Sequence, residues 1–517
     1  MFLIILACVA DQEGSFALPL PPKPVSERYD IVAIPIDECQ SSEAIAFTEQ
    51  GANLGFEVRL DPEIYHDDGP QVAALDIDSD GLTEVLSCFL WEPLFIYDPQ
   101  PNGTVTHDWV SDFCGPMAVI DLDQDGDDDI LLSSETDIFG DNVIGLLPLW
   151  AQDGHLSHGT LQSFDGGPAR NLRLGHFNAD SHLDAVILRS GQSDFDAQDF
   201  IAWGEGNGQF TFDYSVLGSV HTQGKAFDGA VYDFDGNGWD DIMVVNDMGS
   251  LYGGNVLWWN DSGDFDAASE ESGVRIVQSA MGLDVADFNG DGLLDMVSSD
   301  ATKTILLQGM GDGAWADVTQ SLNANLMAGF EMGWGVRFVD MANDGQPEII
   351  LAQGDHFYEG AVDVEYEGPM TPSVASWSGG QFEEVASELG FDEEGSYRAV
   401  LPIHWNNDGI MDYWISEVRK TPLLYVSEGC TGSSYLHVQA PEGTYIRYEQ
   451  NGKRHSHRIS GSSSYAASIS PQIQIGFGEQ ETLQQVAIKL PRTSEWHEVS
   501  ESLSLPHHIH VSRRTGE

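Results

Sequence analysis

A nine-residue pattern that recurs seven times constrains the fold of this 517-residue chain more than any other feature. Its complete form places Asp at position 1, Asp or Asn at positions 3 and 5, Gly at position 6 and an acid at position 9, with an apolar run on each side. The copies begin at residues 76, 121, 176, 233, 287, 340 and 404, so successive starts lie 45 to 64 residues apart. A repeat of this length is typical of one blade of a β-propeller, and seven copies lie within the known range of blade numbers.

The residues around each copy predict a hairpin of two buried strands. Runs such as Met117–Ile120 and Ile130–Leu132 flank the pattern on either side. A later element in most repeats combines a strand, a Gly-rich turn and an aromatic residue, as in Trp203–Phe210 and Trp258–Phe265, which suits the outer hairpin of a blade. No long stretch has helical periodicity.

Charge divides the chain into two parts. The sequence has 84 acidic and 21 basic residues and a formal net charge of −63, but residues 431–517 hold eight of each kind. A change this sharp predicts a domain boundary near residue 430. The predicted fold class is therefore all-β: a seven-bladed β-propeller at 41–430 followed by a small C-terminal β domain at 431–517. The charge excludes nucleic-acid binding and disfavours anionic lipid headgroups.

The N-terminal residues predict export. Residues 1–10 are mainly apolar, and Ile5–Cys8 resembles a bacterial lipobox, in which Cys8 would be lipidated. The first basic residue is Lys23, so the usual basic region is missing, and a plain secretory signal is the alternative. Residues 11–40 contain several prolines and predict an extended tether. We expect an exported protein, either a cell-envelope lipoprotein or an extracellular one.

Four further cysteines favour disulfides, because an even number in an exported protein usually pairs. They are Cys39, Cys88, Cys114 and Cys430, and none stands in CxxC spacing, which argues against a zinc site. The preferred pairing is Cys88–Cys114 with Cys39–Cys430, since the second bond would tie the two ends of the acidic region together. Four buried free thiols are the alternative.

The repeated loop has the donor set of a calcium site. Alternate oxygens along a curled loop point inward, Gly permits the left-handed turn, and a flexible all-oxygen shell suits Ca²⁺ better than Mg²⁺. For a single copy the alternative is a solvated Asp/Gly turn. The complete copies supply the candidate ligands Asp76, Asp78, Asp80, Glu84, Asp121, Asp123, Asp125, Asp129, Asp233, Asp235, Asn237, Asp241, Asp287, Asn289, Asp291 and Asp295.

Three weaker copies lose one or more ligand positions. Their remaining candidates are Asn178, Asp180, Asp184, Asp340, Asp344, Glu348, Asn406, Asp408 and Asp412. His176 and His404 stand at position 1 in two of them, which favours a decayed loop over a zinc or copper site. We therefore expect about four to seven structural Ca²⁺ ions.

These repeats resemble the FG-GAP/VCBS repeats of integrin α-subunit propellers. The closer resemblance is to the cartilage-acidic-protein-like family, whose propeller carries a C-terminal ASPIC/UnbV domain. Met281–Asp295, Met332–Gly354 and, in the tail, Ile475–Gly478 carry it, and together it covers about residues 45–510. The resemblance implies an exported, Ca²⁺-binding, non-catalytic surface protein.

The expected function is a rigid module that presents loops to an unidentified surface protein or polysaccharide. We expect a monomer that touches a membrane through a lipid on Cys8 and in no other way. The sequence contains no HExxH, GxSxG or P-loop motif, and its paired carboxylates fall almost entirely in the repeated loops, so we predict no enzymatic activity. A glycan-active propeller enzyme and a purely structural acidic surface protein are the alternatives.

Overall fold

The chain folds almost entirely into strands, which confirms the all-β prediction. Short helices occur at Gly51–Leu54 (α2), Gly249–Tyr252 (α3), Ala386–Leu389 (α4) and, as a 3-10 turn, Glu270–Ser272 (η3). None of the described helices is long and apolar enough to cross a membrane. The computed structural model describes residues 29–35, 45–54, 69–78, 82–89, 93–100, 105–111, 114–138, 141–152, 154–190, 198–217, 225–327, 332–355, 370–406, 408–418, 421–428, 432–462 and 464–513.

Each copy of the repeated pattern joins the first two strands of a different sheet, so the predicted hairpins are confirmed. The first three of these sheets are β3–β6 (Gln71–Leu75, Glu84–Cys88, Leu94–Pro99, Val105–Ser111), β7–β11 (Met117–Ile120, Asp129–Ile138, Asp141–Gln152, His155–His158, Gln162–Ser163) and β12–β15 (Ala169–Gly175, Asp184–Arg189, Phe200–Gly204, Phe210–Asp213). The next three are β16–β19 (Lys225–Tyr232, Asp241–Asp247, Val256–Asp261, Asp264–Ala267), β20–β23 (Ala280–Ala286, Asp295–Asp300, Thr304–Gly311, Ala314–Asp317) and β24–β27 (Gly333–Val339, Glu348–Gln353, Ser373–Ser378, Gln381–Glu384). The seventh is β28–β30 (Tyr397–Ile403, Asp412–Glu417, Leu423–Glu428) with β2 (Ala46–Glu49) at its edge.

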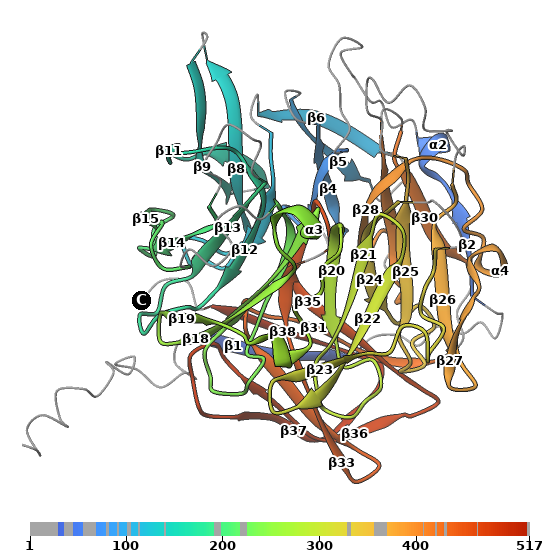
Figure 1. The fold of residues 1–517 in the computed structure, drawn as a ribbon. Helices are drawn as coiled ribbons and strands as arrows, with labels where there is room; N and C mark the ends of the chain where they lie inside the picture. Colours follow the sequence, from blue (N-terminus) through green and yellow to red (C-terminus); the bar gives the residue numbers. More distant parts are fainter. Residues whose placement is uncertain are drawn as a thin grey trace, which may run out of the picture.

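The second strands of several repeat sheets are fully buried, and neighbouring sheets lie side by side in the fold (Figure 1). Strands β13, β17, β21 and β25 are buried at every residue. Val186 of β13 packs in one cluster with Ile242 and Val244 of β17, which belongs to the next sheet. The outer hairpins also lie where the Gly-rich turns predict, for example β14–β15 and β18–β19.

The two N-terminal strands pair with strands near the other end of the chain. β2 pairs antiparallel with β30 and so completes the seventh sheet. β1 (Tyr29–Pro35), inside the predicted tether, pairs antiparallel with β38 (His507–Arg513). Both pairings satisfy a strand edge that would otherwise be open.

The C-terminal strands form a module on one side of the repeat sheets, at the bottom of Figure 1. One of its sheets is β33–β32–β36–β37, and the other joins β38, β31 and β35 to the first repeat sheet through β3. The long strand β35 pairs antiparallel with β31 and parallel with β3. The bounds are β31 Ser434–Gln439, β32 Tyr445–Gln450, β33 Lys453–Arg458, β34 Ser460–Ser462, β35 Ala467–Gly478, β36 Thr482–Lys489 and β37 His497–Ser504.

The residues that lead into β35 lie among the first strands of several repeat sheets. Tyr465 belongs to a core cluster with Trp334 of β24 and Val72 of β3. The Ser464 hydroxyl accepts the N–H of Val336 at 2.6 Å, and the Ser468 hydroxyl accepts that of Val119 at 3.1 Å. We call residues 464–469 the axial segment, because strands β3, β7 and β24 of three different sheets contact it.

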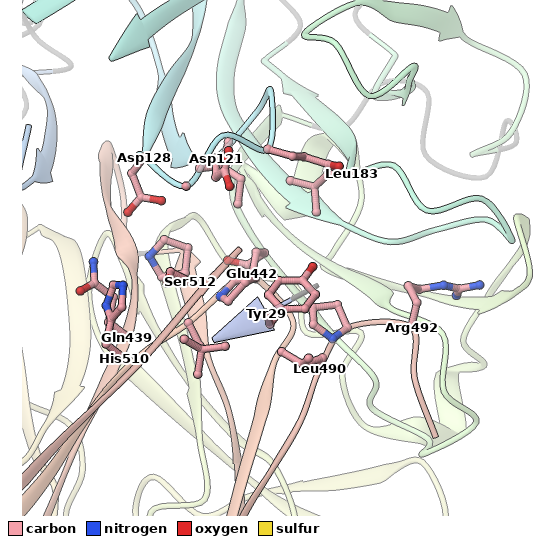
Figure 2. A pocket seen from close by; sticks show the side chains of 18 of the residues that line it. Tyr29, Asp121, Asp128, Leu183, Gln439, Glu442, Leu490, Arg492, His510 and Ser512 are labelled. Atoms are coloured by element: carbon pink, nitrogen blue, oxygen red, sulfur yellow. The ribbon is translucent and has the colours of Figure 1, made fainter. Parts of the chain in front are cut away.

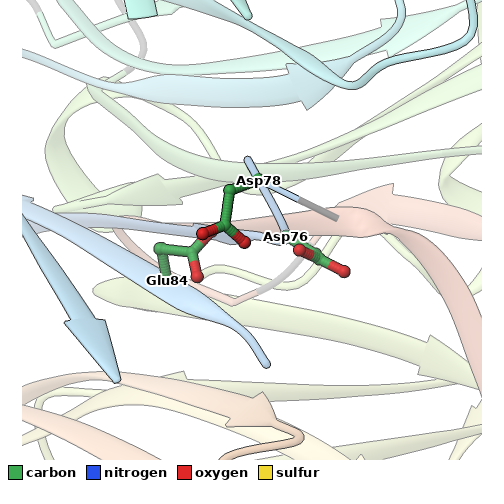
Figure 3. Close-up of side chains that lie close together, drawn as sticks. All are labelled: Asp76, Asp78 and Glu84. Carbon is green, nitrogen blue, oxygen red and sulfur yellow. The ribbon is translucent and has the colours of Figure 1, made fainter. Parts of the chain in front are cut away.

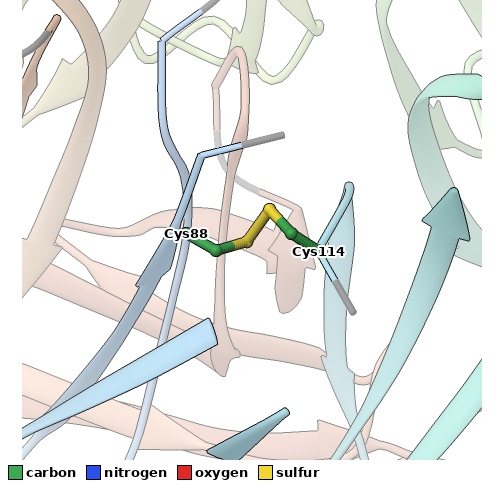
Figure 4. Close-up of a disulfide and its surroundings, with 2 residues drawn as sticks. All are labelled: Cys88 and Cys114. Atoms are coloured by element: carbon green, nitrogen blue, oxygen red, sulfur yellow. A yellow bond between two sulfur atoms is a disulfide. The ribbon is translucent and has the colours of Figure 1, made fainter. Parts of the chain in front are cut away.

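One predicted disulfide is present. Cys88 at the end of β4 bonds to Cys114 before β7, and so joins two neighbouring repeat sheets (Figure 4). Cys8, Cys39 and Cys430 lie outside the described residues, so the second pairing and the lipidation of Cys8 stay predictions.

Candidate metal centres

The acid at position 9 of every copy accepts a hydrogen bond from the backbone N–H of position 2. The donor–acceptor distances run from 2.5 to 3.1 Å. Because this bond spans the loop, it holds the hairpin in its curled form. The pairs are Ile77 with Glu84, Leu122 with Asp129, Phe177 with Asp184, Phe234 with Asp241, Phe288 with Asp295, Met341 with Glu348 and Trp405 with Asp412.

The second oxygen of the same acid binds the third strand of the sheet in six of the seven copies. Five accept a backbone N–H at 2.7 to 2.9 Å, and Glu348 accepts the Ser376 hydroxyl at 3.0 Å. The backbone donors are Ala151, Gly204, Asn260, Gly309 and Ser427. Position 9, the first residue of the second strand, therefore clamps the loop to the third strand in these six copies. The sequence pattern alone does not reveal this role.

Glu84 is the exception. Its Oε2 accepts the N–H of Ile77, but its Oε1 is buried and has no hydrogen-bond partner among the described residues. A buried charged oxygen without a partner is costly, and a bound cation removes that cost. Asp76 and Asp78 lie beside it, with carboxylate oxygens of all three residues within 4.8 Å of one another (Figure 3). Asp80, the fourth candidate in this loop, lies outside the described residues.

Two more loops gather three carboxylates in the same way. Oxygens of Asp121, Asp123 and Asp129 lie within 4.8 Å of one another, and so do those of Asp233, Asp235 and Asp241. In each set the position-9 acid is buried, position 1 half-buried and position 3 exposed. This arrangement can hold a hard cation through carboxylate oxygens.

Short hydrogen bonds within the loops point the inner carboxylates toward one centre. Asp121 and Asp123 both accept the N–H of Asp125, at 3.0 and 3.2 Å. Asp287 accepts the N–H of Asp291 at 3.0 Å and that of Gly292 at 2.8 Å. The loop at 287 thus has the same curl, with Asn289 as its position-3 acceptor of the Asp291 N–H.

Glycine at position 6 has the left-handed backbone that the pattern predicts. Its φ is 93° at Gly238 and 92° at Gly292. A Cβ at either residue would meet no heavy atom within 4 Å, so the backbone conformation, rather than crowding, requires glycine there.

Burial and mutual repulsion make these acids hard to ionise. Burial raises the pKa of Asp129 and of Asp241 to about 8. Desolvation likewise raises the pKa of Glu84 to about 8, and the negative charges of Asp76 and Asp78 add to the shift. A cation at the centre of the loop would supply the opposite charge that lets all of these carboxylates ionise together.

Several polar groups of the weaker copies have hydrogen-bond partners in the protein. Asp408 accepts the Asn406 amide and the Ser427 hydroxyl, both at 2.8 Å. In the copy at 340, one Asp340 oxygen accepts the N–H of Gly476 in β35 at 3.0 Å. None of the three copies gathers three acidic ligand atoms within 4.8 Å in the part of the chain that the structure describes. The candidate ligands of the weaker copies therefore stay predictions: Asn178, Asp180, Asp184, Asp340, Asp344, Glu348, Asn406, Asp408 and Asp412.

A cavity of about 880 Å³ separates the loops at 121 and 176 from the C-terminal module (Figure 2). Asp121, Asp128, Glu442 and Arg492 line it, together with the side chain of His510. Glu442 accepts hydrogen bonds from the Arg458 side chain and from the N–H of Gly461, both at 2.7 Å, and so fixes the chain shortly before the axial segment. No sequence pattern pointed to this cavity, because it forms between parts of the chain that lie far apart in sequence.

The sheets, each with its motif loop, define a β-propeller built from repeats. Residues 233–298 and 287–351 match a family described as FG-GAP-like repeat, in agreement with the repeat type expected from the pattern. No curated protein matches the sequence of the chain.

The chain also has distant matches among solved structures. A lectin from Agrocybe aegerita that recognises non-reducing terminal N-acetylglucosamine is 16% identical, with 63% of this chain and 83% of the lectin covered and a TM-score of 0.40. YCF48 bound to D1 peptide is 8% identical, with 79% and 97% covered and a TM-score of 0.40. An ancestral GH74 enzyme is 11% identical, with 70% and 48% covered and a TM-score of 0.43. At these values none of them indicates what this chain binds.

Proposed function

We propose that this chain is an exported, calcium-stabilised and non-catalytic β-propeller that presents a rigid surface to a protein or polysaccharide at the cell envelope. The observation that carries the proposal is the convergence of buried and half-buried carboxylates in the loops at 76, 121 and 233. Oxygen ligands of this charge and flexible spacing suit Ca²⁺, and a chain of net charge −63 gains most from such ions.

The architecture proposed with this function has seven blades. The seven sheets that carry a motif loop are its blades, and residues 431–517 form an ASPIC/UnbV-like β domain of the kind found in the cartilage-acidic-protein-like family. Residues 1–10 direct export, and a lipid on Cys8 is the expected anchor. The complete loops hold about four Ca²⁺ ions, and the weaker loops raise the number to at most about seven.

The contacts around the cavity support a binding role over catalysis. Glu442 is bonded to Arg458, which also bonds Asp240 at 3.1 Å, so these charged groups already have structural partners.

Asp128 favours the second candidate, a glycan-active enzyme, because burial raises its pKa to about 6, close to the value of a general acid at neutral pH. Glycan cleavage that Asp128→Asn abolishes, with bound calcium unchanged, would establish that candidate instead.

Thermal unfolding of the mature chain in millimolar CaCl₂ and in excess chelator tests the proposal, with bound metal counted by mass spectrometry. The expected result is four or more Ca²⁺ ions per chain and a large loss of stability on chelation, since each site filled to 100 times its Kd adds about 2.7 kcal/mol. Stability that follows molar NaCl and ignores Ca²⁺ would support the purely structural acidic role. The calcium-loaded chain is then screened against polysaccharides and surface proteins.

A further inference from the structure

Four histidines form a row where the seventh sheet meets the C-terminal module. His404 follows β28, His437 lies in β31, and His508 and His510 lie in β38. Successive ring centroids are 4.7, 4.6 and 6.2 Å apart. Strands β31 and β38 run parallel with His437 opposite His508, so the sheet register places these two side by side.

Three buried ring nitrogens of this row have no hydrogen-bond partner in the part of the chain that the structure describes. Among the described residues, neither Nδ1 nor Nε2 of His404 is bonded, and Nε2 of His508 is also unbonded. Buried polar side-chain atoms nearly always have a partner, and each one left without a partner costs about 1–3 kcal/mol. His176, the other histidine at position 1 of a loop, differs, because its Nδ1 lies 3.0 Å from the backbone oxygen of His182.

One ring nitrogen of His437 has the hydrogen bond that usually orients a metal-binding histidine. Nε2 of His437 lies 2.7 Å from Oε1 of Gln472 in β35. With Nε2 donating to that oxygen, the lone pair of His437 resides on Nδ1. A second ring nitrogen held by a neighbouring acceptor fixes the tautomer of a ligating imidazole and orients it.

We propose that His404, His437 and His508 bind one divalent transition-metal ion of the zinc type at this junction. Imidazole nitrogens suit Zn²⁺, Ni²⁺ and Cu²⁺, whereas Ca²⁺ takes oxygen ligands, so this site is chemically distinct from the repeated loops. Two imidazoles that share one ion at about 2.0–2.1 Å per nitrogen bring their rings to about 5 Å apart. The spacings of 4.7 and 4.6 Å fit that geometry for two of the three ring pairs. The rings form a row, and the nitrogens of the three do not all lie within 4.8 Å of one another in the structure, so one outer ring must turn about its Cα–Cβ bond to close the shell.

Such an ion would join two parts of the molecule. His404 belongs to a loop of the seventh sheet, and His437 and His508 belong to the C-terminal module. The replacement of the position-1 aspartate by His404 therefore removes a calcium ligand and supplies a nitrogen ligand to this junction.

Zinc titration of the tag-free full chain tests the proposal, in saturating CaCl₂ at neutral pH with a chromophoric zinc chelator as competitor. The native chain should bind one Zn²⁺, and His508→Ala and His404→Asn should each weaken binding about tenfold or more. Gln472→Leu, which keeps all three rings, should weaken it by about 10–100-fold. His155→Ala is the matched control, because His155 is an exposed histidine of β10.

Absence of zinc binding by the native chain would overturn the proposal, and so would equal affinity in all of these variants. X-ray absorption of the zinc-loaded native chain decides the matter even where a variant fails to fold. A first shell with at least three imidazole nitrogens supports the site at the row of histidines. An oxygen-rich shell would place the zinc in the acidic loops and refute it.

Discussion

The loop at Asp233 and the loop at His404 have the same clamp but different inner positions. Asp241 accepts the N–H groups of Phe234 and Asn260, both at 2.8 Å, and Asp412 accepts those of Trp405 and Ser427 at 2.9 and 2.7 Å. The first loop gathers Asp233, Asp235 and Asp241 around one point. The second has a histidine at position 1 that lies beside His437 instead.

This difference shows that the pattern combines two separable functions. Position 9 holds the hairpin against the third strand whether or not the other ligands are present. Positions 1, 3 and 5 form the cation shell, and they can change while the hairpin persists. A weak copy of the pattern therefore predicts the strand pairing of its sheet as well as a complete copy does, although it predicts a metal ion less well.

The largest expected effect is the pH dependence of the chelated protein, because the position-9 acids of all seven loops contribute. Burial raises the pKa of Asp129 and Asp241 to about 8 and that of Asp412 to about 7, against about 4 in the unfolded chain. The folded state then binds more protons, so unfolding free energy falls as the pH rises from about 4 to 8, by at most about 1.4 kcal/mol per pH unit for each group.

Calcium should reverse that slope in the complete loops, because protons and the ion compete for the same oxygens. Denaturant unfolding between pH 5 and pH 8, with calcium and with chelator, measures both slopes. Equal slopes in the two conditions would mean that no ion occupies the loops.

Without calcium, replacement of the position-9 acid should lower the free energy of unfolding by nearly the same amount in the weak loop at 404 as in the complete loop at 233. Asp412→Ala leaves buried N–H groups without an acceptor, and we expect a loss of about 2–5 kcal/mol that chelator does not change. Asp241→Ala loses the clamp and the ion, so its loss in calcium should be larger by about 2.7 kcal/mol. Chemical denaturation of both variants in both conditions measures the difference, and a chelator-sensitive cost for Asp412→Ala would contradict the separation.

Replacement of the position-3 residue should affect the complete loop at 233 much more than the weak loop at 404. Asp235→Ala keeps the clamp at Asp241 and removes one carboxylate from the shell, so one Ca²⁺ ion and about 2–3 kcal/mol should be lost in calcium. Asn406→Ala, the matched change in the weak loop, should cost less than about 1 kcal/mol and leave the number of bound ions unchanged. Mass spectrometry measures the number of ions bound to each of the two variants. An unchanged number for Asp235→Ala would mean that the loop at 233 is not a calcium site.

The smallest expected effect concerns the turn itself. Gly238→Ala keeps every oxygen ligand and places a Cβ in open space, so the backbone alone is strained at a φ of 93°. We expect a loss of about 1 kcal/mol and a weaker calcium affinity. Calorimetric titration with Ca²⁺ measures the affinity, and unchanged binding would show that the loop tolerates another backbone conformation.

The sequence predicted local features well, because each of them lies within one repeat. The motif hairpins, the outer hairpins and the Cys88–Cys114 bond all connect residues within a short stretch of chain or neighbouring repeats. The pairings of β1 with β38 and of β2 with β30 were not predicted, since nothing in a short strand specifies a partner almost the full chain length away.

The junction with the C-terminal module was missed for a similar reason. The axial segment reads as small polar and apolar residues, and its role depends on strands from three sheets that surround it. The alternating histidines of β38 predict an exposed strand when read alone. Their proximity to His404 and His437 follows from sheet order, which a single sequence does not specify.

The pairing of β2 with β30 also has a consequence for biosynthesis. Residues 46–49 leave the ribosome long before residues 423–428, and synthesis at about 5–20 residues per second separates them by roughly 20 to 75 s. Throughout that interval the nascent chain carries an unpaired strand, so the seventh sheet cannot be completed until residues 423–428 have been made. Completion of this sheet is therefore a late step in folding, and partner proteins that shield open strands during synthesis would raise the yield of folded chain.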